Sequence, residues 1–586
     1  MERLLTVFGE NLNKDLPLND YPRPQLARES FVNLNGRWQY AIVDKNEERV
    51  GYQGEIIVPF SPECILSGVE KIVKPTDVLY YYRKFNFKKT NDVVILHFGA
   101  SDYYTVVKVN GKEVGSNYGG YYPFSFDVTS VIVDGENEIE VIVTDPSDTG
   151  TQARGKQTTK RGGIWYTPQS GIWQTVWLEE LPASYVKSLK ITPDIDKDIV
   201  NIEIGYSAGA EETRITVYDK GEAITTVTTF DGKAVIPMKD YQLWSPENPY
   251  LYDLEISLYK DVVKSYFGMR KFGIGKDSKG ISRLMLNNKP YFHNGLLDQG
   301  YWSDGMYTAP SDEALIYDIK TMKDMGFNML RKHIKIEPLR WYYHCDRLGM
   351  LVWQDMISGG GIYNLGATTT VPALNLVFNT KKFSKNDQEK NYAFFSREDR
   401  KGREEYYVDS ERMIDLLYNV VSLSVWVPFN EGWGQFDAIK AYEFYKAKDN
   451  TRIIDHASGW HDQGYGDLNS FHIYFTAYGY PKYDKNDDRP IVLSEFGGYS
   501  LQAKGHMYNT EKFFGYRKYY DQDKFNKALS KLYKKVEKMI ARGLSATVYT
   551  EVSDVEDECN GLLSYDRKLV KTDMKMMQEL NKKIKL

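Results

Sequence analysis

The sequence predicts a chain of three parts, with two β-sandwiches followed by a (β/α)8 barrel. Three observations support this fold class. The 586 residues are enough for several domains, at roughly 100–200 residues each. Residues 1–275 contain short apolar runs separated by turn signals, which is typical of β-structure. From residue 276 onward, strand-like runs alternate with helical stretches, which indicates parallel βα units.

The β-rich half divides into two predicted domains, residues 1–183 and residues 184–275. In the first, Asn110-Gly111 lies between two strand-like runs and predicts a tight hairpin. The boundary is placed near Leu181–Ser184, where a proline and a small residue interrupt the pattern. The shorter runs that follow predict a smaller, immunoglobulin-like sandwich.

Residues 276–586 contain eight candidate parallel strands, which fit a (β/α)8 barrel. The strands are Pro290–Asn294, Phe327–His333, Leu351–Asp355, Ser424–Glu431, Arg452–His456, Ser470–Tyr474, Ile491–Phe496 and Ala546–Val552. Helices are expected at Asp312–Met325, Pro338–Leu348 and Phe525–Arg542. An open doubly wound sheet is the alternative, which is disfavoured because no glycine-rich phosphate loop follows the first strand.

One predicted connection, residues 356–406, is too long for a plain loop. It follows the third barrel strand and contains three consecutive glycines and three consecutive threonines. Connections of this length are usually functional or disordered. On a barrel, this one would leave the C-terminal rim, where active sites lie.

The composition excludes several classes of protein. A net charge of −5 gives no basic excess for binding nucleic acid. No apolar run is long enough to span a membrane, and the first residues do not resemble a secretory signal, so a cytoplasmic protein is expected. Three cysteines argue against a disulfide framework. A homo-oligomer is compatible with the sequence. Aromatic residues reach 14%, which suits either sandwich cores or sugar binding.

Two glutamates follow apolar strands of the predicted barrel. Glu431 comes after SLSVWVPF, and Glu495 comes after PIVLS. Carboxylates at such positions project into the mouth of a barrel. Hydrolysis of a glycosidic bond needs a protonated carboxyl group to donate to the leaving oxygen and an ionised one to attack the anomeric carbon. We therefore predict Glu431 as the general acid/base, with Trp426, Trp433 and Phe429 desolvating it, and Glu495 as the nucleophile. The alternative is a buried ion-pair partner of Arg331.

Several motifs resemble glycoside hydrolase family 2, the family of β-galactosidases, β-glucuronidases and β-mannosidases. The motifs of the first half are Tyr21-Pro-Arg-Pro, Leu34-Asn-Gly-Arg-Trp38, Tyr82-Arg-Lys-Phe85, His97–Thr129, Gly162-Gly-Ile-Trp165, Ser170-Gly-Ile-Trp173, Trp244–Tyr250 and Gly268–Phe272. The resemblance covers nearly the whole chain. It implies a sugar-binding jelly-roll sandwich over residues 1–183, an immunoglobulin-like sandwich over residues 184–275 and a catalytic barrel over residues 276–586.

In the barrel, Asn430-Glu431 is similar to the family's acid/base pair, whose Asn binds the 2-hydroxyl of the sugar, and Ser494–Gly497 is similar to the nucleophile strand. The resemblance also implies a set of substrate-binding or positioning residues. These are Arg331 beside the nucleophile, together with His333, Asp355, Tyr474, His472, Trp433, Asp298 and Tyr549. Tyr549 is aligned with a position on the eighth strand that is usually Trp.

Some residues depart from the family pattern and bear on specificity. The glucuronidases of the family carry an Asn-x-Lys motif that binds the sugar carboxylate, whereas the corresponding segment here is Glu558-Cys-Asn560-Gly-Leu-Leu563. The missing lysine disfavours β-glucuronides. Lys332 and Glu551 are candidates for contacting an unusual substituent. Sugar identity therefore stays open among galactosides, mannosides, arabinosides and galactofuranosides.

The sequence predicts a retaining exo-glycosidase acting on small oligosaccharides, with a β-galactoside as the first choice. No metal or other cofactor is required for this chemistry, although some relatives bind Mg²⁺ or Na⁺. A non-catalytic sugar-binding protein and a hydrolase that cleaves the interior of polysaccharides are the alternatives. Both carboxylates at their strand ends argue against the first of these, and the missing signal sequence argues against the second.

Overall fold

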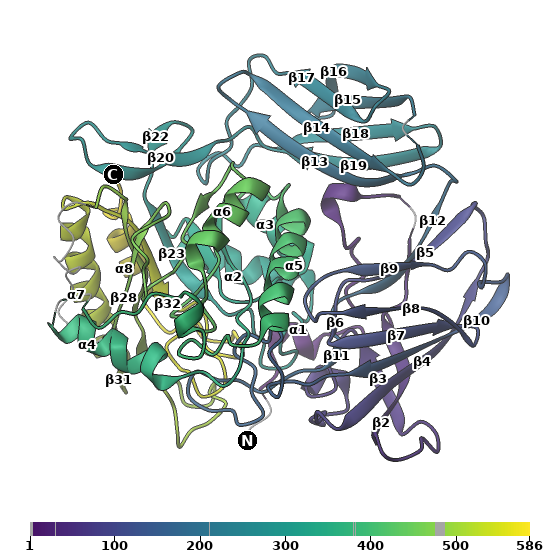
Figure 1. Ribbon diagram of the computed structural model, residues 1–586, viewed down its shortest axis with the longest axis horizontal. Coiled ribbons are helices and arrows are strands. Elements are labelled where there is room, and N and C mark those ends of the chain that lie inside the picture. The colour runs from purple at the N-terminus through teal and green to yellow at the C-terminus, as the bar shows by residue number, and fades with distance from the viewer. Residues whose placement is uncertain (1–3, 30, 210, 379, 381, 475–486) are drawn as a thin grey trace.

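The computed structural model describes residues 4–29, 31–209, 211–378, 380, 382–474 and 487–586. Figure 1 shows three bodies, with a β-sandwich from the first part of the chain on one side, a second sandwich above it and an α/β body beside both. Within the described residues, no helix is both long and apolar enough to cross a membrane.

The first sandwich consists of a four-stranded and a six-stranded sheet, both antiparallel. The four-stranded sheet has the order β1 (Val32–Asn33), β12 (Val176–Leu181), β5 (Val93–Phe98) and β9 (Phe124–Asp127). The six-stranded sheet has the order β3 (Gly54–Val58), β2 (Gly36–Asp44), β4 (Asp77–Phe87), β10 (Gly135–Thr144), β7 (Tyr104–Val109) and β8 (Lys112–Tyr118). A two-stranded sheet joins β6 (Ser101–Asp102) to β11 (Gly171–Ile172).

Alternating burial along these strands builds the first core. The pattern of β7 alternates between half-buried and buried residues, as expected for a strand with one face on the core. Asn110 and Gly111 connect β7 to β8 with φ angles of 49° and 75°. Two consecutive positive φ angles are those of the predicted tight hairpin turn, which this pair of residues favours.

The second sandwich is smaller. One sheet has the order β13 (Val186–Asp194), β14 (Ile199–Tyr206) and β17 (Lys233–Pro237). The other has the order β16 (Glu222–Thr229), β15 (Thr213–Asp219), β18 (Tyr252–Leu258) and β19 (Asp261–Phe267). A separate antiparallel sheet of β20 (Phe272–Lys276), β21 (Ser282–Leu286) and β22 (Lys289–Pro290) leads into the α/β body.

The α/β body contains one parallel sheet of eight strands. In chain order these are β23 (His293–Asp298), β24 (Met329–Lys332), β25 (Leu351–Asp355), β26 (Leu423–Val427), β27 (Ile453–Ile454), β28 (Asn469–Ile473), β29 (Ile491–Gly497) and β32 (Leu544–Thr550). Their order in the sheet is β27-β26-β25-β24-β23-β32-β29-β28. The first strand, β23, is paired with both the second and the last, as in a closed ring of strands and unlike a doubly wound sheet.

The edge between β27 and β28 is joined by side chains. Ser470, on β28, donates a hydrogen bond of 2.9 Å from its Oγ to Asp455 Oδ2, directly after β27. The backbone amide of Ile454 donates to Asp467 Oδ2 over 3.0 Å, just before β28. The eight parallel strands form the curled sheet of the predicted (β/α)8 barrel, and its two edge strands are linked by these side-chain hydrogen bonds.

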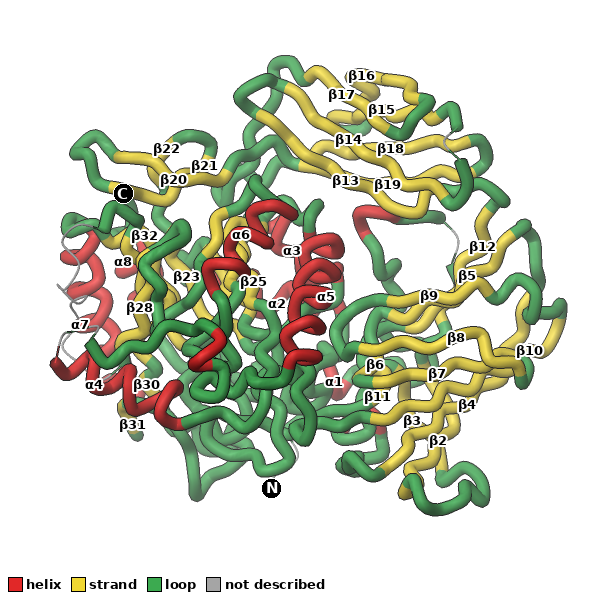
Figure 2. The backbone as a smooth tube through the Cα atoms, viewed as in Figure 1, coloured by secondary structure: helices red, strands yellow, loops and turns green. Residues whose placement is uncertain are grey.

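Helices cover the outer face of the barrel (Figure 2). They are α2 (Asp312–Asp324), α3 (Leu339–Leu348), α5 (Arg400–Leu417), α6 (Ala438–Lys448), α7 (Gln522–Ile540) and α8 (Met574–Asn581). Ser311 accepts a hydrogen bond from the amide of Ala314 at the start of α2, which confirms the predicted N-cap. Three short elements are not part of this layer of helices: α1 (Val7–Glu10) and the strands β30 (Tyr499–Leu501) and β31 (Arg517–Tyr519).

Successive side chains of each barrel strand belong alternately to two hydrophobic cores, one inside the barrel and one between the strands and the helices. Met329, Leu351, Val425 and Val548 belong to the cluster inside the barrel. Leu330, Val352, Trp426 and Tyr549 belong to the cluster between the strands and the helices. Because successive side chains of a strand point to opposite faces, this register fixes which polar side chains face the barrel axis.

The 356–406 connection is partly helical. It contains a π-helical turn (Gly366–Thr370), helix α4 (Val371–Phe378), a 3₁₀ turn (Glu389–Asn391) and the first turn of α5. Its beginning lies at the mouth of the barrel, where the carbonyl groups of Gly360 and Gly361 accept hydrogen bonds from Arg154 of the first sandwich. The connection therefore joins the sandwich to the rim that holds the candidate site.

Candidate active site

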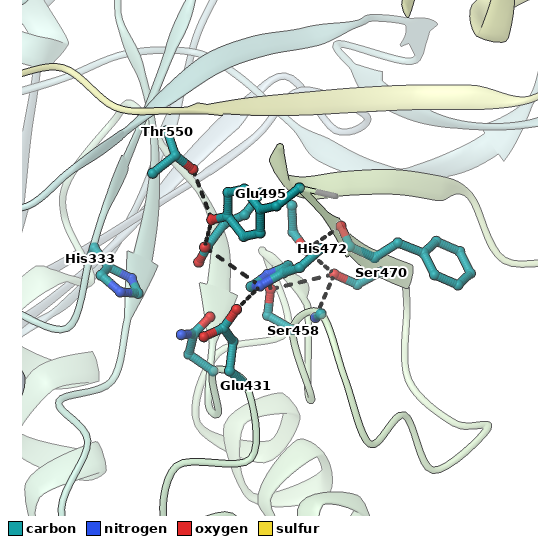
Figure 3. A network of polar contacts seen from close by, with 12 residues as sticks. His333, Glu431, Ser458, Ser470, His472, Glu495 and Thr550 are labelled. Atoms are coloured by element: carbon teal, nitrogen blue, oxygen red, sulfur yellow. Dashed lines mark hydrogen bonds and ion pairs between the residues drawn. The ribbon is translucent and has the colours of Figure 1, made fainter. Parts of the chain in front are cut away.

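The two predicted catalytic glutamates face each other at the C-terminal end of the barrel (Figure 3). Glu495 is 4% exposed and Glu431 is 7% exposed, so both carboxylates are largely removed from solvent. A carboxylate oxygen of Glu431, one of Glu495 and a ring nitrogen of His472 all lie within 4.8 Å of one another. Retaining glycosidases separate their two carboxyl groups by roughly 5–5.5 Å.

Glu495 lies on β29, within the strand itself. Its Oε1 is 3.3 Å from the guanidinium of Arg331 on β24. Its Oε2 accepts a hydrogen bond from the hydroxyl of Tyr474, which directly follows β28. The Tyr474 ring stacks on Tyr516 with the ring centres 3.9 Å apart, which fixes the direction of that hydroxyl.

Glu431 lies on a tight turn, not on the strand that the sequence predicted to extend to it. Strand β26 ends at Val427, and Glu431 has a φ of 52°. The backbone holds this turn, because the Glu431 amide donates to the carbonyl of Ser458 over 3.0 Å. Gly434 closes the turn so tightly that an added Cβ would lie 2.1 Å from the Gly359 carbonyl oxygen. The NEGWG segment thus needs glycine to pack against the connection.

His472 bridges the two carboxylates. Its Nδ1 lies 2.7 Å from Glu431 Oε1 and 3.6 Å from Glu495 Oε2, and its Nε2 lies 3.3 Å from Ser458 Oγ. Burial lowers the pKa of His472 to about 4, so the ring is neutral at ordinary pH. A neutral ring with its proton on Nδ1 donates to Glu431. These three side chains are also the group of described residues whose ligand atoms could hold a metal ion.

Arg331 connects most of the polar groups of the site. Its guanidinium donates to both carboxylate oxygens of Asp355, at 2.9 and 3.0 Å, to Asn430 Oδ1 at 2.7 Å and to the carbonyl of Ser494 at 2.9 Å. Burial lowers the pKa of Arg331, but the carboxylates of Asp355 and Glu495 raise it more, so the guanidinium stays charged. Arg331 thereby fixes the side chain of Asn430 and places a positive charge beside Glu495.

The two glutamates differ in their electrostatic surroundings. Burial raises the pKa of Glu431 to about 8, against the opposing charges of Lys156 and Arg331. Burial and the neighbouring Glu431 also raise the pKa of Glu495 above its usual 4.5, although the charge of Arg331 and the hydrogen bond from the Tyr474 hydroxyl act to lower it. Glu495 therefore has more groups in contact with it that stabilise its ionised form.

His333 and Asp355 form a second pair beside Arg331. His333 Nδ1 lies 2.6 Å from Asp355 Oδ2. Burial lowers the pKa of His333 to about 3, so its Nδ1 carries the proton and donates to the carboxylate. Burial raises the pKa of Asp355, but Arg331 and His333 lower it more, which keeps Asp355 ionised. In Figure 3, His333 lies on the far side of Glu495 from His472.

Aromatic rings from three segments line the mouth. Trp433 follows Glu431, and its ring centre lies 5.3 Å from that of Trp165 in the first sandwich and 6.1 Å from that of Tyr363 in the connection. It also meets the His333 ring edge to face at 6.1 Å. Flat apolar faces of this kind suit the C–H faces of a sugar ring.

Two predicted substrate-binding residues, Asp298 and Tyr549, and the candidate substituent contact Lys332 lie outside this arrangement. Asp298 forms a 2.8 Å ion pair with Lys332, whose ammonium lies over the ring of Trp341 on α3. Tyr549 packs in the outer core, 5.7 Å from the Phe496 ring. Both follow an inward-facing residue on their strands and so point toward the helices. The structure thus places Asp298, Lys332 and Tyr549 between barrel and helices rather than at the mouth.

Three further residues belong to the site but are missed by the sequence reasoning. Thr550, the residue after Tyr549, lies 3.0 Å from the Tyr474 hydroxyl through its Oγ1. Tyr516 supports Tyr474. Lys156 enters from the first sandwich and lies 5.9 Å from the centre of the Trp433 ring. Residues 145–170 do not show the alternating pattern of a strand, although they lie within the predicted sandwich. Long connections of this kind are often functional, and this length is the one feature of the sequence that could have pointed to Lys156.

Family models match three consecutive parts of the chain. The model of the sugar-binding domain of glycosyl hydrolases family 2 matches residues 70–182, a model described as glycosyl hydrolases family 2 matches residues 184–270, and the model of the family's TIM barrel domain matches residues 279–586. The chain belongs to glycosyl hydrolases family 2. The predicted family resemblance and the predicted order of domains are confirmed.

Several curated relatives are named β-galactosidases, and one, from Formosa agariphila, is named a putative β-glucuronidase at 27% identity over 287 residues, which cover 46% of this chain and 33% of the relative. The β-galactosidase from Lactococcus lactis subsp. lactis is 27% identical over 356 residues, which cover 58% of this chain and 33% of the relative. The one from Oenococcus oeni is 30% identical over 271 residues, which cover 42% of this chain and 25% of the relative. The chain thus spans about a quarter to a third of the length of these relatives.

Solved structures with the same fold carry other names. A β-glucuronidase from an uncultured Clostridium species has a TM-score of 0.72 at 16% identity and covers 95% of this chain and 99% of its own. A family 2 β-galacturonidase from Eisenbergiella tayi, bound to galacturonate, has a TM-score of 0.71 at 18% identity, with 96% and 99% covered. At these identities the likeness establishes the fold and leaves the sugar open.

Proposed function

We propose that this protein is a retaining exo-glycosidase, with Glu495 as the nucleophile and Glu431 as the general acid/base. The observation that carries the proposal is the approach of the two carboxylates, whose oxygens lie within 4.8 Å across the mouth. This spacing suits direct attack by one carboxylate, because an inverting enzyme needs about 6.5–9.5 Å to admit a water molecule.

The charge states required by this chemistry follow from the contacts. A pKa of about 8 keeps Glu431 protonated near neutral pH, ready to donate to the leaving oxygen. Arg331 and the Tyr474 hydroxyl support an ionised Glu495. These contacts support the proposal that Glu431 is the acid and Glu495 is the nucleophile.

In the first step, a Glu495 oxygen attacks the anomeric carbon while the glycosidic bond breaks and Glu431 transfers its proton to the departing oxygen. In the second, Glu431 takes a proton from water, the water oxygen attacks the anomeric carbon, and the bond to Glu495 breaks. Two inversions give retention. The Asn430 amide has a buried Nδ2 atom without a hydrogen-bond partner among the described residues, which suits the 2-hydroxyl of a bound sugar.

The substrate we propose is a small oligosaccharide that is cleaved at its terminal sugar, with a β-galactoside as the first choice. The names of the relatives from Lactococcus lactis and Oenococcus oeni support the galactoside. The rings of Trp165, Tyr363 and Trp433, which form a wall on one side of the mouth, support cleavage of a terminal sugar. Mannosides, arabinosides and galactofuranosides are the alternatives within the same chemistry. A cytoplasmic location, a homo-oligomeric state and the lack of need for a metal stay predictions from the sequence.

A panel of p-nitrophenyl glycosides tests the proposal, followed by proton NMR of the first product formed from the best substrate. We expect turnover of at least one glycoside and initial release of the sugar with its anomeric configuration retained. Initial release of the opposite anomer would contradict the assignment of Glu495 as nucleophile. Sugar binding without turnover of any glycoside would favour the alternative of a non-catalytic sugar-binding protein.

A further inference from the structure

A cavity of about 90 Å³ lies between the first sandwich and the barrel, apart from the catalytic mouth. It is lined by the segment before β1, by the first sandwich and by the barrel at the starts of α2 and α3. None of the described residues that contact Glu431 or Glu495 lines it. Ligand sites occur preferentially at such junctions between domains. We call it the interface cavity, and its lining includes Asp20, Tyr121, Trp173, Ala309, Leu315 and Glu337.

Much of the wall of the interface cavity is apolar. It includes the rings of Tyr121 and Trp173, which are almost fully buried, and Leu315 of α2. The polar atoms of both rings are bonded elsewhere. Trp173 Nε1 donates to the carbonyl of Gly120 over 2.7 Å, and the Tyr121 hydroxyl accepts a hydrogen bond from Gln157 over 3.0 Å. These rings therefore offer the cavity apolar surface, which favours a ligand with a hydrocarbon body.

One carboxylate oxygen of a lining residue has no partner. Glu337 follows β24 and is 3% exposed. Its Oε1 accepts hydrogen bonds from Lys332 Nζ over 2.9 Å and from Lys335 Nζ over 2.8 Å. Its Oε2 is buried and has no hydrogen-bond partner among the described residues. Buried polar atoms are almost always satisfied, so this acceptor indicates a ligand that brings a donor.

The charges around Glu337 are already balanced. Its two ammonium partners are Lys332 and Lys335, and Lys332 also lies 2.8 Å from Asp298 Oδ2. Two ammonium groups and two carboxylates cancel. An additional buried charge would be left without a counter-ion, which is strongly unfavourable. The donor that suits Glu337 Oε2 is therefore a neutral O–H or N–H group.

The interface cavity reaches the surface beside Asp20, whose side chain is 50% exposed, whereas the side chain of Glu337 is 2% exposed. Arg340 lies at this outer end. It donates to Asp312 Oδ2 over 2.6 Å and lies 3.5 Å from Asp20 Oδ1, so its charge is paired as well. A small molecule can therefore enter beside Asp20 and place its donor at the inner end.

We propose that the interface cavity binds a small neutral molecule with one hydrocarbon ring or short branched chain, whose single hydroxyl or N–H group donates to Glu337 Oε2. The volume limits the ligand to this size, because 90 Å³ equals that of about three water molecules in the liquid. Any larger part of the ligand has to extend toward Asp20. This site is separate from the proposed glycosidase site and does not depend on it.

Phenol and fluorobenzene are matched probes, because they share a ring and differ in the one group that can donate. Crystals soaked in phenol should show its oxygen within hydrogen-bond distance of Glu337 Oε2. Titration followed by saturation-transfer NMR should give phenol a Kd of about 1 mM, an ordinary affinity for a molecule of this size. Fluorobenzene should bind at least about 10-fold more weakly, because it makes no hydrogen bond to the charged carboxylate.

Two variants locate the binding. Ala309→Leu adds carbon atoms to the wall where the ligand lies and should weaken phenol binding at least about 10-fold. Ala223→Leu is the matched control, because it makes the same change at an exposed position of β16, and its Kd should stay within about twofold of the wild type. Glu337→Gln keeps the shape but loses the carboxylate, so phenol should lose its advantage over fluorobenzene. Circular dichroism and thermal unfolding establish that each variant is folded, and Ala309→Leu decides if Glu337→Gln unfolds.

Three outcomes would overturn the proposed ligand site: soaked crystals with only water in the interface cavity, equal affinities for phenol and fluorobenzene, or unchanged phenol binding in Ala309→Leu. The last result would mean that phenol binds elsewhere, such as at the catalytic mouth. None of these measurements uses turnover of a glycoside. Failure of the ligand site and failure of the proposed function are therefore told apart.

Discussion

Replacing Tyr474 by phenylalanine tests whether the nucleophile depends on the hydrogen bond that it receives. The hydroxyl donates to Glu495 Oε2, and because it has a single proton, the Thr550 hydroxyl 3.0 Å away must donate to it in turn. The phenyl ring retains the stack on Tyr516. Tyr474→Phe therefore removes one hydrogen bond to a charged group with little change in packing.

The size of the effect follows from that bond. A hydrogen bond to a charged group contributes about 1.5–3 kcal/mol. Its full loss from the transition state would lower kcat/KM about 10- to 160-fold, at 1.36 kcal/mol per tenfold change, which is the upper range that we expect. Because the Tyr474 hydroxyl lowers the pKa of Glu495, its loss should also move the acidic limb of the pH profile to higher pH.

Initial rates on the best p-nitrophenyl glycoside, measured across pH, provide the assay. The matched control is Tyr533→Phe, which removes a buried hydroxyl that has no hydrogen-bond partner among the described residues and lies in the outer core. If Tyr474→Phe changed kcat/KM no more than Tyr533→Phe and left the acidic limb in place, the contact would have no role in activating Glu495.

Three other changes have defined outcomes. Glu431→Ala should lower turnover of disaccharides about 10²- to 10⁴-fold yet largely spare dinitrophenyl glycosides, which need no proton donor; equal losses on both would contradict the acid role. For the wild type, kcat/KM should fall as pH rises through about 8, because Glu431 then loses its proton. It should also fall at acidic pH, as Glu495 becomes protonated near its pKa, which lies above the usual 4.5. A flat pH profile between pH 7 and 10 would refute the predicted fall on the alkaline side. Arg331→Met leaves Asp355 and Glu495 without their buried counter-charge and should cost about 3–5 kcal/mol of unfolding free energy in urea. The surface variant Lys320→Met should cost less than about 1 kcal/mol.

The sequence predicted the domain order, the barrel and the approach of Glu431 and Glu495, because apolar runs and strand ends carry these features directly. The connection after β25 was correctly placed at the rim, since it begins where a barrel strand ends. Strand bounds were less accurate. Glu431 was expected on its strand, but the apolar residues that continue to Phe429 belong partly to a turn that the Ser458 carbonyl holds.

Side-chain direction and contacts between domains could not be read from the pattern. The barrel strands are buried on both faces, so hydrophobicity does not reveal which residues face the axis. Asp298 and Tyr549 were therefore included in the predicted site although they point toward the helices. Lys156 belongs to a different domain, and only folding brings it to the barrel mouth.

The central claim is that Glu495 forms a covalent bond to the sugar while Glu431 acts as acid and base. Incubation with the 2-deoxy-2-fluoro analogue of the best substrate, followed by digestion and mass spectrometry, tests this claim most directly. The labelled peptide should contain Glu495, and Glu495→Gln should remain unlabelled and inactive. A sugar attached to Glu431, or full activity in Glu495→Gln, would contradict the account.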